Sequence, residues 1–178
     1  MLSQTAEYAL RVVVFLGTLG KQAATTAQIA AATRVPAGYL AKILQSLSRA
    51  GIVRSQRGLG GGSCLARDAK DLSVHDVVSA IAPVPRIRTC PLGLESHGTR
   101  LCPLHRRLDS AMELVEQAFR LSTIADLVAE PTESIPLLDV ERNPAAATRA
   151  AELAFPVEQR VDLKIRGRSG GSKRKRSS

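Results

Sequence analysis

The sequence predicts a mainly α-helical protein that carries one small β-hairpin, and three observations support this fold class. Apolar residues recur at helical spacing in several stretches of the first 130 residues. A glycine-rich run at residues 58–62 separates two short β-compatible segments. A long amphipathic stretch over residues 103–129 comes later in the chain.

The first helix is expected over residues 3–19, where the apolar pattern is that of a packing helix. Thr25 and Gln28 have the spacing of a capping box, in which each residue satisfies a free backbone N–H at the start of a helix. They predict a short helix with Ile29 and Ala30 turned inward.

A turn at residues 33–35 leads to another helix, and Pro36 is expected as its first residue because that position needs no N–H donor. Gly51 lies where a C-terminal cap belongs. The apolar stripe of this helix consists of Leu40, Ile43, Leu44 and Leu47. The opposite side carries Gly38, Lys42, Gln45 and Arg49. One face is therefore core, and the other is free to contact a partner.

Residues 52–55 and 63–66 are expected to form the two strands of the hairpin. Ser73 and Asp76 then predict a capped helix over residues 73–82. Two short helices joined by a tight turn and followed by a hairpin make a winged helix-turn-helix.

Residues 103–129 are expected to form one long C-terminal helix with a 3-4 apolar stripe that could pair with a twin helix. The stripe consists of Leu104, Leu108, Ala111, Val115, Ala118 and Ser122. The expected organisation is a winged helix-turn-helix domain at 1–83, a Cys/His loop at 84–102, a dimerisation helix at 103–130, and a poorly ordered Pro/Ala-rich and basic tail at 131–178.

Composition narrows the class of protein. The net charge is +9, but seven positive residues follow Asp162, so the rest of the chain carries only +2. No stretch has the roughly 20 apolar residues of a membrane span, and no signal peptide is visible, so we expect a cytoplasmic protein with no membrane partner. Three cysteines make a poor disulfide framework. The aromatic content of 3% argues against a stacking platform for single-stranded nucleic acid.

A winged helix-turn-helix suits double-stranded DNA, because a helix fits the major groove, where base edges carry an unambiguous hydrogen-bonding pattern. Small residues near the start of the second short helix would permit close approach to the bases. Its polar residues, and the arginines of the hairpin, are candidates for phosphate and base contacts. A solvated helix face and a plain surface turn are the alternatives for any single residue.

Several ordered motifs resemble one family. They are Tyr8-Ala9-Leu10, Thr26-Ala27-Gln28-Ile29-Ala30, Gly38-Tyr39-Leu40-Ala41-Lys42-Ile43-Leu44, Leu47, Gly51-Ile52-Val53-Arg54-Ser55 and Arg57-Gly58-Leu59-Gly60-Gly61-Gly62. Over residues 1–130 the chain resembles the Rrf family of winged-helix transcription regulators, of the IscR/NsrR type. The resemblance implies a homodimer that binds a pseudopalindromic operator, most often as a repressor. Ser63 stands where relatives usually carry an aromatic residue.

Motif and chemistry together give the candidate DNA-contacting residues. They are Thr26, Ala37, Gly38, Tyr39, Ala41, Lys42, Arg49, Arg54, Arg57, Gly60 and Gly61.

Cysteine and histidine residues cluster before and at the start of the long helix, where thiolate and imidazole suit an iron–sulfur cluster or zinc. The ligand spacing of cluster-binding relatives falls here on Cys90, Ser96, Cys102 and His105, so the middle ligand is a serine. The resemblance also places Glu7 where some relatives supply an acidic ligand from the other subunit. The candidate metal ligands are therefore Cys90, Cys102, His105, His97 and Glu7, and the expected cofactor is a [2Fe–2S] cluster.

Other interpretations stay open. Zinc could use the two cysteines and two histidines, a metal-free thiol switch needs only the cysteines, and all of these groups could be structural. Cys64 is expected to be a small buried residue and His75 to face solvent. No orienting group or oxyanion-hole motif accompanies Cys102 and His105, so an enzyme is not expected. A nonspecific nucleic-acid-binding protein that relies on its basic tail is the remaining alternative.

Overall fold

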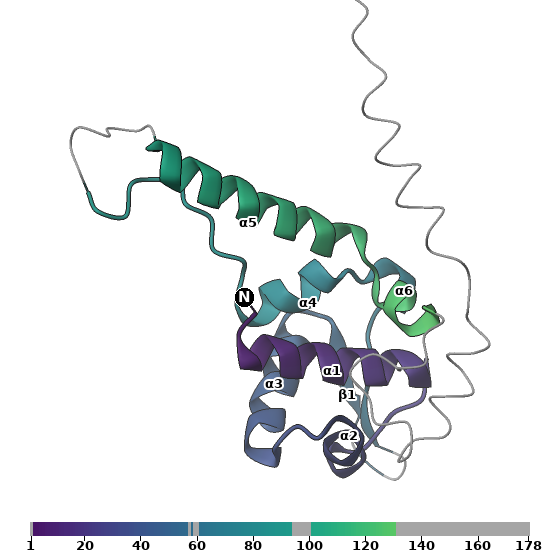
Figure 1. Cartoon of the computed structure of the whole chain (residues 1–178). Coiled ribbons are helices and arrows are strands. Elements are labelled where there is room, and N and C mark those ends of the chain that lie inside the picture. Colours follow the sequence, from purple (N-terminus) through teal and green to yellow (C-terminus); the bar gives the residue numbers. More distant parts are fainter. Residues whose placement is uncertain (1, 57, 59–60, 94–100, 131–178) are drawn as a thin grey trace, which may run out of the picture.

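The computed structural model describes residues 2–56, 58, 61–93 and 101–130. Helices dominate it, and a two-stranded antiparallel sheet is inserted between the third and fourth of them (Figure 1). The elements are α1 (Gln4–Leu19), α2 (Thr26–Thr33), α3 (Ala37–Arg49), β1 (Val53–Gln56), β2 (Gly62–Leu65), the 3-10 turn η1 (Ala69–Asp71), α4 (Val74–Ile81), α5 (Pro103–Leu121) and α6 (Ile124–Ala129). The mainly α-helical fold class with a hairpin wing is confirmed.

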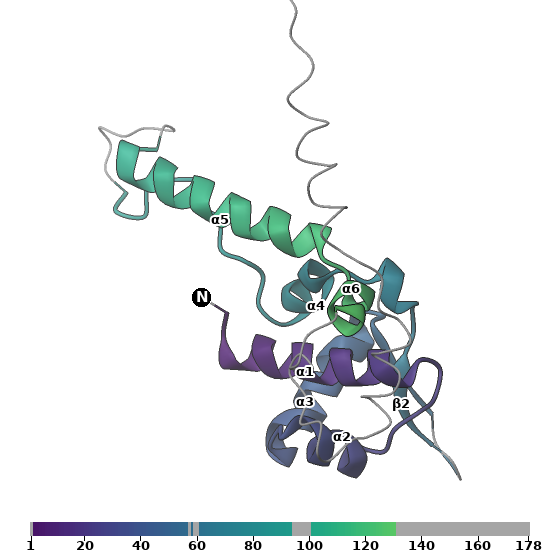
Figure 2. The same ribbon diagram turned by 45° about the vertical axis from the view of Figure 1, so that its right-hand side comes forward.

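Helix α1 lies at the centre of the fold. Figures 1 and 2 show it between α2 and α3 on one side and α4 and α6 on the other. Val12, Val13, Val14 and Leu16 have no exposed surface. Ser3 caps the helix, because its hydroxyl accepts a hydrogen bond from the N–H of Ala6. Helices and strand β2 therefore share one core built around α1.

The helix-turn-helix forms as its capping signals predict. The Thr25 hydroxyl accepts from the N–H of Gln28, and the Gln28 side chain accepts from the N–H of Thr25. Arg34 ends α2 in the left-handed conformation with φ 53°. Pro36 is the N-cap of α3 and not its first helical residue, so that expectation is off by one position. The φ of a proline suits either position.

The C-terminus of α3 is closed by a Schellman motif. The N–H of Gly51 donates to the carbonyl of Ser48, and the N–H of Ile52 donates to the carbonyl of Leu47. Gly51 has φ 68°, a conformation that favours glycine. The predicted position of this cap is confirmed, and it directs the chain from α3 into the wing.

The wing is the β1–β2 hairpin, whose register pairs Val53 with Leu65 and Gln56 with Gly62. The strands lie within one residue of their expected positions. Ala24 and Ser63 exchange backbone hydrogen bonds of 2.9 and 2.8 Å, which fasten the wing to the segment between α1 and α2. The wing is thus held rigidly beside the helix-turn-helix.

The expected long C-terminal helix is wrong in one respect, because it is two helices. Helix α5 ends at Leu121, Ser122 and Thr123 are extended, and Thr123 with Asp126 forms a capping box that starts α6. The N–H of Val74 donates to the carbonyl of Ser122, and that of Ile124 donates to the carbonyl of Leu72. These tertiary hydrogen bonds favour a break in the helix over its continuation. As a result α6 packs on α1, and α5 projects away from the body of the molecule (Figure 1).

Among the described residues, no helix is long and apolar enough to cross a membrane.

Gly62 provides a test of how the wing is held. A Cβ at this position would lie 2.4 Å from the carbonyl oxygen of Ala24, a backbone atom that cannot move aside cheaply. We expect Gly62→Ala to lower the free energy of unfolding by roughly 1–3 kcal/mol, measured by urea denaturation.

Gly38→Ala is the matched control, because nothing lies within 4 Å of its Cβ and the position is an exposed helical one. It should raise stability by up to about 1 kcal/mol. Equal stability of Gly62→Ala and the wild type would contradict the close approach of the wing to Ala24.

Candidate functional site

Helix α3 presents one face to the core and the other to solvent. Leu40, Ile43, Leu44 and Leu47 are buried, as their spacing predicts. The described candidates on α2, α3 and β1 are all exposed, namely Thr26, Ala37, Gly38, Tyr39, Ala41, Lys42, Arg49 and Arg54. Lys42 and Arg49 are two helical turns apart on the same side of α3. This face is positively charged, and small residues at its start leave its backbone accessible.

The start of α1 lies beside the exposed face of α3. The rings of Tyr8 and Tyr39 meet edge to face with centroids 5.9 Å apart, and the Arg11 guanidinium lies 5.5 Å from the Tyr8 ring centroid. A cleft of about 300 Å³ separates the two helices. Hydroxyl groups and the Lys42 side chain are among its lining groups, from Ser3, Thr5, Tyr39, Lys42 and Ser46. Polar groups of α1 therefore extend the α3 surface, which sequence reasoning missed.

Fewer of the candidate DNA-contacting residues in the wing lie within the described residues. Arg57 and Gly60 lie outside the described residues, and the N–H of Gly61 donates to the carbonyl of Gly58. The Nε of Arg54 donates to the Sγ of Cys64 at 3.2 Å. Cys64 is 3% exposed, as expected for a small buried residue.

Arg54 also borders a second cleft, of about 420 Å³, between the end of α1, the base of the wing and α6. Lys21 and Arg67 line the same cleft. The Arg54 side chain is thus directed away from the start of α3, although it is exposed like the other candidates.

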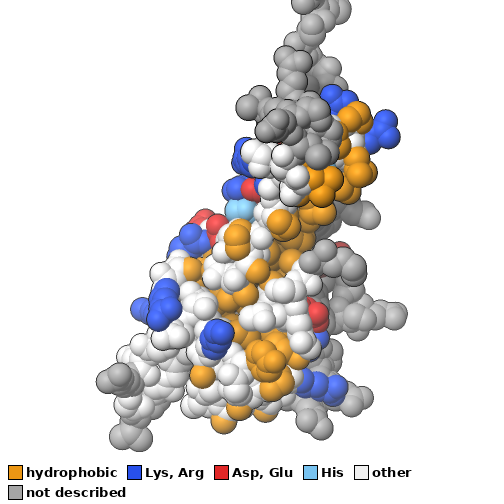
Figure 3. All heavy atoms as spheres, turned by 90° about the vertical axis from the view of Figure 1, so that its left-hand side faces the viewer, with side chains coloured by type: hydrophobic (Ala, Val, Ile, Leu, Met, Phe, Trp, Pro, Cys, Tyr) orange, Lys and Arg blue, Asp and Glu red, His pale blue; other side chains and the backbone are white. Residues whose placement is uncertain are grey.

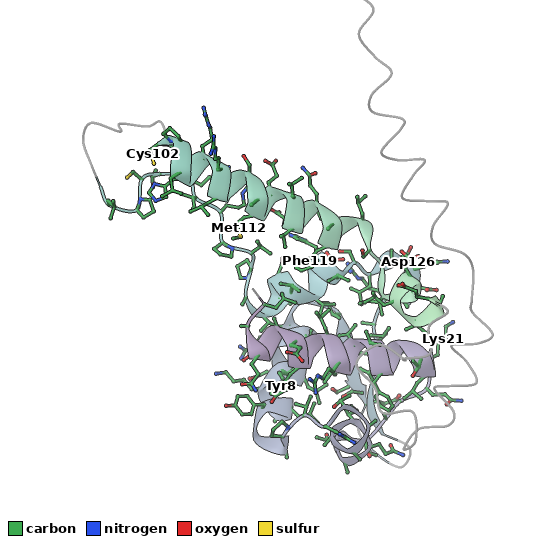
Figure 4. All side chains as sticks on the ribbon, in the orientation of Figure 1. Tyr8, Lys21, Cys102, Met112, Phe119 and Asp126 are labelled. Atoms are coloured by element: carbon green, nitrogen blue, oxygen red, sulfur yellow. The ribbon has the colours of Figure 1, made fainter. Side chains whose placement is uncertain are left out.

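Two of the candidate metal ligands come together at the start of α5. Cys102 is the N-cap of this helix, and its Sγ lies 3.3 Å from the Nδ1 of His105 one turn later. Figure 4 shows Cys102 at the end of α5 that projects furthest from the body of the molecule. Cys90 lies in the segment that approaches this end, where its carbonyl accepts from the N–H of Gly93 in a tight turn.

The other candidates do not join this pair within the chain. Glu7 lies on the first turn of α1, where it is ion-paired with Arg11. His97 and Ser96 lie outside the described residues. Among the described residues, no three His, Cys, Asp or Glu side chains are placed to hold a metal ion. Cys102 and His105 offer one thiolate and one imidazole, a donor pair that fits part of a cluster or zinc site.

An ion-pair network joins the segment after α4 to α5. Arg86 binds Asp109 through two parallel hydrogen bonds of 2.7 and 2.8 Å, and the N–H of Ile87 donates to the same carboxylate at 2.9 Å. Arg86 also lies 3.4 Å from Glu116 and 3.5 Å from Glu113. These contacts hold residues 86–87 against the middle of α5.

The network continues into α4. His75 Nε2 lies 3.4 Å from a Glu116 carboxylate oxygen, and the His75 side chain is only 15% exposed. The expectation that His75 faces solvent is therefore wrong, because α5 folds over it. Met112 and Phe119 lie on the same side of α5, toward α4 (Figure 4).

The electrostatics of the network favour the charged forms of Arg86, Asp109 and Glu116. Hydrogen bonds from Arg86, supported by the Ile87 N–H, lower the pKa of Asp109 to about 2. Hydrogen bonding to Asp109 raises the pKa of Arg86. Arg120 and Arg86 lower the pKa of Glu116. Sequence reasoning missed this network, although acids at residues 109, 113 and 116 share one helical face.

A helix-turn-helix with an exposed basic face and a fastened wing defines a DNA-binding regulator, and the comparisons identify its family. The Rrf2 family, described as "Iron-dependent Transcriptional regulator", matches residues 2–130. The chain belongs to this family. A relative from Aquifex aeolicus (strain VF5), the "Putative HTH-type transcriptional regulator", is 25% identical over 129 residues, which cover 71% of this chain and 90% of the relative.

Solved structures share the fold. CymR (YrzC), the global cysteine regulator of B. subtilis, matches with a TM-score of 0.60 and 21% identity, covering 71% of this chain and 95% of that one. T. potens IscR matches with a TM-score of 0.60 and 20% identity, covering 75% and 93%. Staphylococcus aureus CymR matches with a TM-score of 0.58 and 24% identity, covering 74% and 100%. The winged-helix assignment is therefore confirmed.

Proposed function

We propose that this transcriptional regulator binds a pseudopalindromic DNA operator as a homodimer and represses transcription there, with α3 in the major groove. The observation that carries the proposal is the division of α3 into a buried apolar stripe and an exposed basic face. The wing beside it would follow the phosphate backbone. The chain thus acts by binding and not by catalysis.

The homodimer is supported by the surface of α5. None of its residues is buried, yet Leu104 is 62% exposed, Leu114 is 67% exposed and Leu121 is 56% exposed. With Leu108, Ala111 and Val115 they form a continuous apolar side of one helix. Figure 3 shows hydrophobic side chains gathered toward the upper end of the molecule, which α5 forms. A second α5 offers a matching apolar side, and a symmetric pair would bury both.

A signal reaches the regulator through the segment at 84–102 and the start of α5. We assign Cys90, Cys102 and a histidine as ligands of a [2Fe–2S] cluster, with Glu7 of a second subunit completing the set once it leaves Arg11. The paired Cys102 and His105 side chains and the iron-dependent description of the family support this assignment. When bound, the cluster would supply redox sensitivity to the dimer.

A thiol switch is the second candidate signal, because Cys90 and Cys102 flank the same segment. The S. aureus relative has also been solved in an "oxidized form". Both mechanisms use the same two cysteines, so metal analysis distinguishes them.

The first experiment concerns the α3 surface. Lys42→Ala should weaken operator binding by roughly 1–3 kcal/mol, because the mutation removes a cation from the exposed face and leaves the apolar stripe intact. Fluorescence anisotropy with operator and random duplexes at fixed salt measures this change.

Lys70→Ala is the control, since Lys70 is also exposed but lies on η1, outside the helix-turn-helix. Equal losses in both variants would mean that α3 is not the contact surface.

The second experiment concerns the dimer. Leu108→Glu places a charge on the apolar side of α5 in both subunits, so we expect the dimer to weaken by at least about a hundredfold, roughly 3 kcal/mol. Sedimentation equilibrium gives the dissociation constant.

Gln117→Glu adds the same charge elsewhere on α5 and should leave the dimer intact. A Leu108→Glu protein that stays fully dimeric would remove α5 from the interface.

The third experiment concerns the signal. Protein purified without oxygen should contain iron and sulfide in equal amounts, and Cys90→Ala and Cys102→Ala should each lose them. Cys64→Ala should keep them, because Cys64 is buried in the wing. Comparison of His97→Ala with His105→Ala identifies the histidine ligand. If the wild type holds no iron, sulfide or zinc even after reconstitution, the metal assignment fails and the thiol switch replaces it.

A further inference from the structure

The contact between Arg86 and Asp109 joins two parts of the chain that each lead to a cysteine. Arg86 and Ile87 lie just before Cys90, and Asp109 lies two helical turns after Cys102. The Asp109 carboxylate accepts three hydrogen bonds from residues 86 and 87, two from the side chain and one from the backbone. A carboxylate held in this way fixes both the position and the direction of the segment that donates to it.

The distances that the chain can span from this contact to the two cysteines are similar. Along α5, the seven residues from Asp109 back to Cys102 span roughly 10 Å at 1.5 Å per residue. From Ile87, the three residues to Cys90 span at most roughly 10 Å. Figure 1 shows the segment after α4 meeting α5 and then running alongside it toward its projecting end. These lengths allow Cys90 to lie level with Cys102.

We propose that Arg86 and Asp109 form a clamp that sets the register of Cys90 against Cys102, which makes Arg86 a positioning residue of the sensor. The inference rests on the proposed sensory function of the two cysteines. The clamp does not bind metal or DNA. It holds the two thiols opposite each other before any ligand or oxidant arrives, so less conformational entropy is lost when they are joined.

The clamp also has a route to the DNA-binding unit. Arg86 donates to Glu116, which lies against His75 of α4. Further along α4, Val77 and Val78 are buried in the core that contains α3. A shift of the cysteine segment would therefore be passed to α4 through Arg86, Glu116 and His75, whose side chains are only 15–21% exposed.

The geometry separates this clamp from an ordinary surface ion pair. An exposed ion pair that makes a single contact contributes little to stability. An arginine that binds a carboxylate through two parallel hydrogen bonds, within a network, has a more strictly defined geometry. The Arg86 and Asp109 side chains are 21% and 19% exposed, and a backbone N–H joins the same carboxylate. Arg120, in contrast, contacts Glu116 within α5 alone.

The test measures how strongly the two thiols are held together, in metal-free protein carrying Cys64→Ala so that only Cys90 and Cys102 remain. Protein is equilibrated with mixtures of reduced and oxidised glutathione. One oxidised glutathione takes two electrons from the two thiolates and leaves as two reduced glutathiones, while a Cys90–Cys102 disulfide forms. The equilibrium gives the effective concentration of one thiol near the other.

Arg86→Gln and Asp109→Asn should each lower this effective concentration by roughly three- to tenfold, since either change releases the segment. The double variant should be no worse than either single one, because both remove the same contact. Arg86→Lys keeps the positive charge but cannot form the two parallel hydrogen bonds. Its effective concentration should lie between those of the wild type and Arg86→Gln. Arg120→Gln, the matched control, should equal the wild type.

Two results would overturn the clamp. One is an unchanged effective concentration in Arg86→Gln and Asp109→Asn, with both variants folded by circular dichroism. The other is a wild type that forms no Cys90–Cys102 disulfide at any glutathione ratio. Operator binding of the reduced and oxidised wild type tests the sensory function separately. If the effective concentration falls in the variants but operator binding is the same for the reduced and oxidised wild type, the clamp is supported and the proposed sensory function is wrong.

Discussion

The burial of α1 is the constraint on which the rest of the structure depends. This helix is apolar around most of its circumference, and residues 12–16 are all buried, so it has to be covered on opposite sides. The helix-turn-helix and the wing cover one side, and α4 and α6 cover the other (Figure 2). Because α3 packs its apolar stripe on the same core, its polar face is left outward. The α3 surface that we propose contacts DNA is thus a consequence of how α1 is enclosed.

Much of this unit could be predicted from the sequence because its signals are local. Capping boxes at Thr25 and Ser73, the glycine after α3 and the 3-4 stripe of α3 each depend on residues within a few positions of one another. The break after α5 could not be predicted as readily. Its capping box at Thr123 was present, but the apolar stripe runs through Ser122, and hydrogen bonds to Leu72 and Val74 decide the outcome. Those partners lie some fifty residues away in the chain.

The candidate site divides in the same way. The exposed face of α3 followed from periodicity, whereas the partners of Arg86 are 23 and 30 residues distant and follow no local rule. His75 was expected in solvent because nothing in its own helix predicts that α5 lies over it. The cysteine spacing predicted a ligand set but not how its members are held, and among the described candidates Cys102 and His105 are in contact, at the start of α5. The proposed ligand Glu7 would come from a second subunit, so no distance within one chain could indicate it.

Helix α5 differs from the other helices in what holds it. None of its residues is fully buried. Its inner side contacts the rest of the protein through Phe119 and through the contacts of Arg86, Glu116 and His75, and its outer side carries exposed apolar side chains. Ion pairs as exposed as these contribute little to stability, and their main effect is to fix the position of the helix. If a second α5 covers the outer side, the position of the helix is set jointly by a dimer contact and by the segment that carries Cys90. A change at the cysteines then acts on an element that is shared between subunits and has no fully buried residue. A small energy applied to such an element can move the two DNA-binding surfaces relative to each other.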